Sequence, residues 1–198
     1  LKNQITAGEF YCSGITGIDE KTRTLYFVAN GREADEDPYF KHHYSINLNG
    51  NGIKLLNPGD FDHQVSMSES SRFFINNFSR VNTTPESALY NSAGQKVMEL
   101  EKADLSNLFA AGYKFPEPFK VKAGDGITDL YGVMYKPFDF DSTKVYPLIE
   151  YVYPGPQTEA VNKSFGRSMD RMDRPAQIGF ILVTVGKPGG HPERSKWY

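Results

Sequence analysis

The 198-residue sequence has few of the residues that would tie it to several common classes of protein. Its single cysteine, Cys12, excludes an intrachain disulfide and a metal site built only from cysteines. The formal net charge of -2 gives no indication of a nucleic-acid partner. The longest apolar runs, such as residues 179–185, are far too short to span a bilayer. What remains is an ordinary globular mixture, with 39% hydrophobic and 23% charged residues, long enough for one large or two small domains.

Helical periodicity is also scarce in the first half of the chain, where residues 1–112 have the pattern of short strands separated by turns. The clearest signal is Asn49-Gly50-Asn51-Gly52, because Asn-Gly supplies the positive φ angles of a tight hairpin. The expected turns lie at residues 19–23, 49–52, 68–71 and 92–95. This regular spacing favours a β-propeller with about one four-stranded blade and portions of its neighbours.

After residue 112 the pattern changes. Pro116 and Pro118 are typical of a linker or a first edge strand. We expect strands at residues 118–123, 128–137, 146–153 and 180–186, and one poor helix within residues 164–179. The last two strands are nearly continuous in apolar residues, so we expect both to be buried on both faces. Antiparallel strands followed by buried strands with a helical crossover predict the opening of an α/β sheet.

Two stretches of the second half carry a resemblance to a known family. Residues 122–159 (KAGDG…YPLIEYVYPGPQTE) and 179–190 (GFILVTVGKPGG) resemble the prolyl-oligopeptidase family of serine peptidases, especially dipeptidyl peptidase IV and its bacterial relatives. Residues 59–85 and 89–100 are similar to the last propeller blades of that family. The resemblance implies a mostly β chain: partial β-propeller blades at residues 1–115, followed by the first strands of an α/β-hydrolase sheet at residues 116–198.

The resemblance also implies a role for one tyrosine. In the family, the tyrosine of a Val-Tyr-x-Gly-Pro sequence donates its hydroxyl to the oxyanion of the tetrahedral intermediate, and Tyr153 has that position here. A donor held on a rigid strand end is preorganised where negative charge develops, which lowers the barrier by roughly 3–4 kcal/mol. The residues alone favour a simpler explanation, in which Tyr153 is a half-buried aromatic side chain at the end of a strand.

The remaining catalytic groups of the family are missing from this sequence. No Gly-x-Ser-x-Gly elbow occurs, nor does a Glu-Glu pair of the kind that grips a substrate amine in dipeptidyl peptidases. The family's Asp-x-Arg-Gly loop is replaced by residues 186–189, Gly-Lys-Pro-Gly. The resemblance therefore implies an inactive fragment of a serine peptidase that cleaves after proline, with the nucleophile, Asp and His outside this sequence. A start without methionine fits the expectation that the sequence was cut from a longer protein.

A different class of function stays open: a non-enzymatic propeller module that binds a protein or a glycan. Under the peptidase hypothesis the partner is the peptide substrate of the parent enzyme, with no cofactor and no metal. We also expect self-association through unpaired strand edges. Family analogy places the parent protein in a periplasmic or extracytoplasmic compartment.

Other candidate side chains have ordinary structural explanations. We expect His42 and His43 on a surface hairpin, their rings on opposite faces of a strand and so unable to share a metal. His63 lies near Asp60 and Asp62, where turn chemistry explains the same residues as a cation site would. His191 is too close in sequence to the tyrosine to be the family's general base.

Three further candidate features are an acidic run, a group of arginines and the single cysteine. The acidic run Glu33, Asp35, Glu36 and Asp37 could grip a cationic ligand but is expected to be a solvated loop. The arginines at 167, 171 and 174 alternate with aspartates, as on a salt-bridged helix surface. Cys12 is expected to be a small buried residue.

Overall fold

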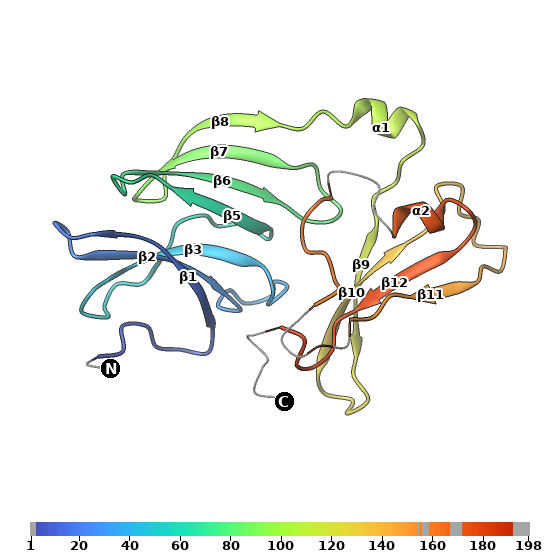
Figure 1. Cartoon of the computed structure of the whole chain (residues 1–198), viewed down its shortest axis with the longest axis horizontal. Helices are drawn as coiled ribbons and strands as arrows, with labels where there is room; N and C mark the ends of the chain where they lie inside the picture. The colour runs from blue at the N-terminus through green and yellow to red at the C-terminus, as the bar shows by residue number, and fades with distance from the viewer. Residues whose placement is uncertain (1–2, 154, 156–158, 167–171, 192–198) are drawn as a thin grey trace. The chain divides into compact units, whose positions relative to one another are not determined.

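The computed structural model describes residues 3–153, 155, 159–166 and 172–191. These form two compact units: residues 1–79 with 85–103, and residues 80–84 with 104–198. Each unit is described by itself. The described chain is mostly β and contains three four-stranded sheets (Figure 1). The predicted mostly β fold is therefore confirmed.

The first sheet lies in the first unit and is antiparallel throughout, in the order β1-β2-β3-β4. Its strands are β1 (Tyr11–Asp19), β2 (Thr24–Asn30), β3 (Lys41–Asn47) and β4 (Lys54–Leu55). The side chain of Asp19 accepts hydrogen bonds from the backbone N–H groups of Lys21 and Thr22, which closes the predicted turn. The central strands β2 and β3 are buried over most of their length, whereas the edge strand β1 is largely exposed.

The second sheet, in the same unit, has the order β5-β6-β7-β8 and is also antiparallel. Its strands are β5 (Asp62–Met67), β6 (Phe73–Ser79), β7 (Glu86–Asn91) and β8 (Lys96–Lys102). Tyr26 and Leu56 pack against Phe74 between the two sheets, and the Phe74 ring stacks on Tyr90 at 5.2 Å. Both sheets are consistent with propeller blades. The prediction of one blade with portions of its neighbours was wrong, because β1 and the two-residue β4 complete a second four-stranded sheet.

The third sheet, in the second unit, is mixed and has the order β11-β12-β10-β9. Its elements are α1 (Ser106–Ala110), β9 (Glu117–Lys122), β10 (Asp129–Tyr135), β11 (Leu148–Glu150), α2 (Asp173–Ala176) and β12 (Ile181–Val185). Strand β11 pairs with β12 in parallel, and the other pairs are antiparallel. Gly132 lets the strands approach, since a Cβ there would lie 2.7 Å from the carbonyl oxygen of Thr184.

Two expectations for this unit need correction. Residues 146–153 were predicted to form a strand buried on both faces, but only Leu148–Glu150 pair, and all three are exposed. Strand β11 is at the edge of the sheet, where Leu148 is 61% and Ile149 is 41% exposed. Strand β12 is central and mostly buried, as expected. Of the helix predicted within residues 164–179, α2 covers four residues, while Arg167 and Arg171 lie outside the described part of the chain.

The core of the second unit includes one residue from a distant part of the sequence. Val81, in the loop between β6 and β7, is 6% exposed and belongs to the cluster that contains Val133, Tyr135, Met172 and Leu182. The loop Arg80–Thr84 therefore belongs structurally to the second unit, although both strands that it joins belong to the first.

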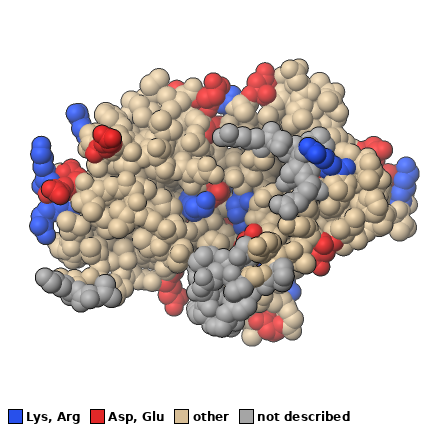
Figure 2. Space-filling model, in the orientation of Figure 1, with Lys and Arg blue, Asp and Glu red and all other residues tan. Residues whose placement is uncertain are grey.

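The surface carries charges of both signs. On the face drawn in Figure 2, Lys and Arg side chains lie among Asp and Glu side chains. Within the described residues, no helix combines the length and the apolarity that crossing a membrane requires.

Candidate functional site

Tyr153 lies shortly after β11, where the chain leaves the third sheet. The backbone N–H of Tyr151 still donates to the carbonyl of Val183 at 2.9 Å, so pairing with β12 continues one residue past Glu150. Tyr153 is two residues further on, and its side chain is 50% exposed. Of the predicted Pro-Gly-Pro turn, Gly155 is described, and Pro154 and Pro156 lie outside the described residues.

The segment after β12 contacts the backbone around Tyr153. The ammonium of Lys187 donates to the carbonyl oxygen of Tyr153 at 3.0 Å and also to that of Gly155. Nearby, the carboxylate of Glu159 packs against Gly186 and Gly190: a Cβ at Gly186 would lie 2.8 Å from its Oε2. Sequence reasoning missed both Lys187 and Glu159. The one available signal was that residues 186–189 depart from the family's loop.

The chemistry available at this strand end is hydrogen-bond donation. A phenol O–H is a donor that can stabilise an oxyanion, and a half-exposed ring can reach a group bound outside the sheet. The described residues place His191, partly exposed, in the loop after β12. The expected role of Tyr153 stays a prediction.

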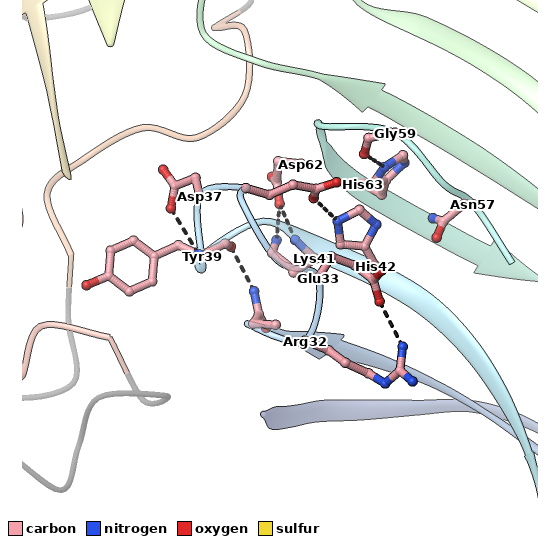
Figure 3. Close-up of polar contacts among 12 residues, drawn as sticks. Arg32, Glu33, Asp37, Tyr39, Lys41, His42, Asn57, Gly59, Asp62 and His63 are labelled. Carbon is pink, nitrogen blue, oxygen red and sulfur yellow. Dashed lines mark hydrogen bonds and ion pairs between the residues drawn. The ribbon is translucent and has the colours of Figure 1, made fainter. Parts of the chain in front are cut away.

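A second group of polar side chains is buried along β3 in the first unit (Figure 3). The Nε2 atom of His42 lies 2.7 Å from a carboxylate oxygen of Glu36. The hydroxyl of Tyr44 donates to Glu33 at 2.9 Å, and burial raises the pKa of this tyrosine, which keeps the donor protonated. Burial also raises the pKa of Glu36, against the lowering effect of His42.

The acidic run is therefore not the solvated loop that was expected. Besides Glu33 and Glu36, which contact β3, Asp37 accepts a hydrogen bond from the backbone N–H of Tyr39 at 2.9 Å. Only Asp35 of the four acidic residues is exposed. The loop folds back because its carboxylates satisfy donors on β3 and at the start of that strand.

The expectation of surface histidines was wrong for His42 and His43, which are 2% and 0% exposed. Their rings have different neighbours: His42 lies 4.8 Å from His63, whereas His43 contacts Phe74 at 4.6 Å. His63 lies in β5 rather than in a turn, and it is 3% exposed. Its Nδ1 faces the side-chain amide of Asn76.

Burial sets the protonation of these rings. It lowers the pKa of His43 from 6.5 to about 4. Burial, and secondarily the neighbouring His42, lowers the pKa of His63 to about 4. Both rings are therefore neutral at pH 7. Within the described ranges, no group of three or more His, Cys, Asp or Glu side chains is arranged to hold a metal ion.

Comparison with known proteins connects this first unit to one family. Residues 1–85 match the "Dipeptidyl peptidase IV (DPP IV) N-terminal region". The matched DPP IV N-terminal region contains all of the first sheet, strands β5 and β6, and the whole polar network around His42.

Individual relatives extend the similarity. Human dipeptidyl peptidase 8 is 28% identical over 205 residues, which is 93% of this chain and 22% of the relative. Probable dipeptidyl-aminopeptidase B of Arthroderma gypseum is 31% identical over 183 residues, 88% of this chain and 19% of the relative. A crystal structure from Bacteroides ovatus, described as a "putative dipeptidyl aminopeptidase IV", matches with a TM-score of 0.74 and 28% identity, covering 94% of this chain and 26% of that one. The chain thus spans about a fifth of the length of these curated relatives.

The predicted resemblance is confirmed for the DPP IV N-terminal region, and the chain is a distant homologue of the dipeptidyl peptidases. One further expectation within that region was wrong. Cys12 is exposed, because it lies on the edge strand β1.

Proposed function

We propose that this chain is part of a dipeptidyl peptidase IV-like serine peptidase that cleaves peptides after proline. Residues 1–115 would be the C-terminal blades of its propeller, and residues 116–198 the start of its α/β-hydrolase domain. The observation that carries the proposal is the match of residues 1–85 to the DPP IV N-terminal region. The similarity to dipeptidyl peptidase 8 over 93% of the chain supports its extension past the propeller.

The topology of the third sheet supports the hydrolase part of the proposal. Strands β9 and β10 form an antiparallel pair, and β11 and β12 are parallel neighbours with α2 between them in sequence. Two parallel neighbours need a crossover connection, which an antiparallel propeller blade does not contain. The same order of strands was expected for the opening of an α/β sheet.

Tyr153 is the proposed oxyanion donor. It follows a strand end, the residue is half-exposed, and its backbone carbonyl accepts a hydrogen bond from Lys187. The nucleophile, Asp and His would lie outside this sequence, which contains no Gly-x-Ser-x-Gly. The 198 residues alone would therefore not hydrolyse peptides, because an oxyanion donor without a nucleophile and base cannot carry out acyl transfer. By family analogy, we place the parent enzyme in a periplasmic or extracytoplasmic compartment.

The test uses the full-length protein. A fluorophosphonate probe should label one serine, and a chromogenic Xaa-Pro dipeptide substrate should be hydrolysed. Tyr153→Phe should lower kcat by on the order of 100-fold or more with an unchanged melting temperature, because it removes only the donor. Tyr146→Phe is the matched control, because it removes a tyrosine hydroxyl that has no proposed role in the reaction and that accepts a hydrogen bond from the N–H of Asp141 at 2.9 Å.

The outcomes separate the alternatives. Normal turnover by Tyr153→Phe removes the oxyanion assignment. A full-length protein that neither binds the probe nor cleaves the substrate contradicts the peptidase proposal and favours a propeller module that binds a protein or a glycan.

A further inference from the structure

The segment that contains Tyr153 and the loop after β12 touch at two points within the second unit. Lys187 bridges the carbonyl oxygens of Tyr153 and Gly155, two residues apart. Glu159 places its carboxylate against Gly186 and Gly190, where a Cβ at Gly190 would overlap it. The loop after β12 therefore contacts the Tyr153 segment through Lys187, and the Tyr153 segment contacts that loop through Glu159.

The backbone of Lys187 is anchored to the third sheet. Its loop directly follows the central strand β12, and the N–H of Gly186 donates to the carbonyl of Tyr131 in β10 at 2.9 Å. A turn within the loop is closed by the N–H of Gly190 donating to the carbonyl of Lys187 at 3.1 Å. The backbone that carries the ammonium is thus fixed to the middle of the sheet.

The segment around Tyr153, in contrast, is weakly anchored by the strand next to it. The adjoining strand β11 is three residues long and exposed, and Tyr153 itself is 50% exposed. The direction of its phenol therefore depends on the backbone of residues 153 and 155. Hydrogen bonds from a charged donor are stronger than neutral ones, and a lysine can donate to several acceptors at once.

We propose that Lys187 is a positioning residue that sets the direction of the Tyr153 hydroxyl, an inference that rests on the proposed oxyanion role. Lys187 does not touch the reacting atoms. It holds the two carbonyls on either side of residue 154, and so fixes the backbone from which the phenol extends. A displacement of about 1 Å at a reacting centre can cost on the order of 100-fold in rate. Loss of this bridge should therefore be visible in turnover.

The first experiment compares variants of the full-length enzyme. Lys187→Met, which keeps the length of the side chain but no donor, should lower kcat at least about tenfold while KM stays within about twofold, because the oxyanion contact forms only in the transition state. Lys187→Arg, which can still donate to both carbonyls, should recover most of kcat. The control is Lys144→Met, since Lys144 is 68% exposed and pairs with Asp141, three positions earlier. It should leave kcat unchanged.

A double-mutant cycle supplies the readout that a merely structural lysine would not change. In the Tyr153→Phe background, Lys187→Met should lower kcat by less than about twofold, because the group that it positions is gone. An equal loss in both backgrounds overturns the inference, and so does an unchanged kcat in Lys187→Met alone. If Tyr153→Phe lowers kcat but Lys187→Met does not, only the positioning role fails. If Tyr153→Phe has no effect, the oxyanion role fails, and the positioning role fails with it.

Discussion

The stability of the first unit should depend on pH through the buried ring of His43. This ring is fully buried, and its Nε2 lies 2.8 Å from the hydroxyl of Thr16. Its ring neighbours are the uncharged side chains of Tyr26 and Phe74. Burial accordingly lowers the pKa of His43 from 6.5 to about 4 in the folded chain.

The sign and size of the effect follow from proton binding. Between pH 6.5 and pH 4 the unfolded chain binds a proton at His43 that the folded chain does not, so the free energy of unfolding falls as the pH falls. This contribution to stability is complete above about pH 6.5 and is lost progressively down to about pH 4. With about 1.36 kcal/mol for each pKa unit, the loss from this residue is about 2 kcal/mol at pH 5.

The assay is urea unfolding followed by circular dichroism at pH 8, 7, 6 and 5. His43→Gln removes the titrating group, so its loss of stability from pH 8 to pH 5 should be about 2 kcal/mol smaller than that of the wild type. His63 contributes to both proteins and cancels in the comparison. The control Thr16→Val keeps the imidazole, and it should lower the free energy of unfolding by a similar amount at every pH. Parallel pH profiles for the wild type and His43→Gln would refute a neutral, buried His43.

Two further predictions concern the first unit. Gly94→Ala should lower the free energy of unfolding by about 1–3 kcal/mol more than Gly52→Ala in urea titrations. Both positions have positive φ, but a Cβ at Gly94 would lie 2.8 Å from the backbone oxygen of Leu56, whereas at Gly52 it would meet a side-chain atom at 3.2 Å. The 198-residue chain should self-associate at high concentration through its exposed edge strand β8, and Met98→Lys should reduce this in light scattering. Equal losses of unfolding free energy in Gly94→Ala and Gly52→Ala would contradict the glycine prediction. A monodisperse wild-type monomer at high concentration would contradict the prediction of self-association.

The strands and turns of the first unit were largely predictable, because their signals are local. The Asn-Gly turn and the turn at Gly94 have the positive φ values that their residue types favour. The count of complete sheets was not predictable. Strand β1 has register shifts and exposed residues on both faces, and β4 is only two residues long, so neither has a clear alternation of apolar and polar residues.

Burial was harder to predict than strand position, because it depends on partners distant in sequence. Leu148 and Ile149 look like core residues, yet they are 61% and 41% exposed at the sheet edge. His42 looks like a surface residue, yet Glu36 and the neighbouring strands enclose it. Hydrophobicity describes what a side chain prefers, but the tertiary arrangement decides which neighbours it receives.

The candidate site was only partly predictable for the same reason. Tyr153 stood out through its Val-Tyr-x-Gly-Pro sequence, which is a local pattern. The contact from Lys187 to Tyr153 spans 34 positions in the sequence, and its acceptors are backbone carbonyls. No pattern of side chains in the sequence therefore predicts it.

The loop Arg80–Thr84 limits how this polypeptide could be divided in the laboratory. Expressing residues 104–198 by themselves would omit Val81, a hydrophobic residue that is 6% exposed in the core of that unit. The truncated product would have a cavity in its core where the Val81 side chain packs in the full chain. Replacing residues 85–103 by a homologous segment would keep Val81 in place. Useful boundaries for chimaeras of this protein are therefore discontinuous, and a single cut near residue 104 is a poor choice.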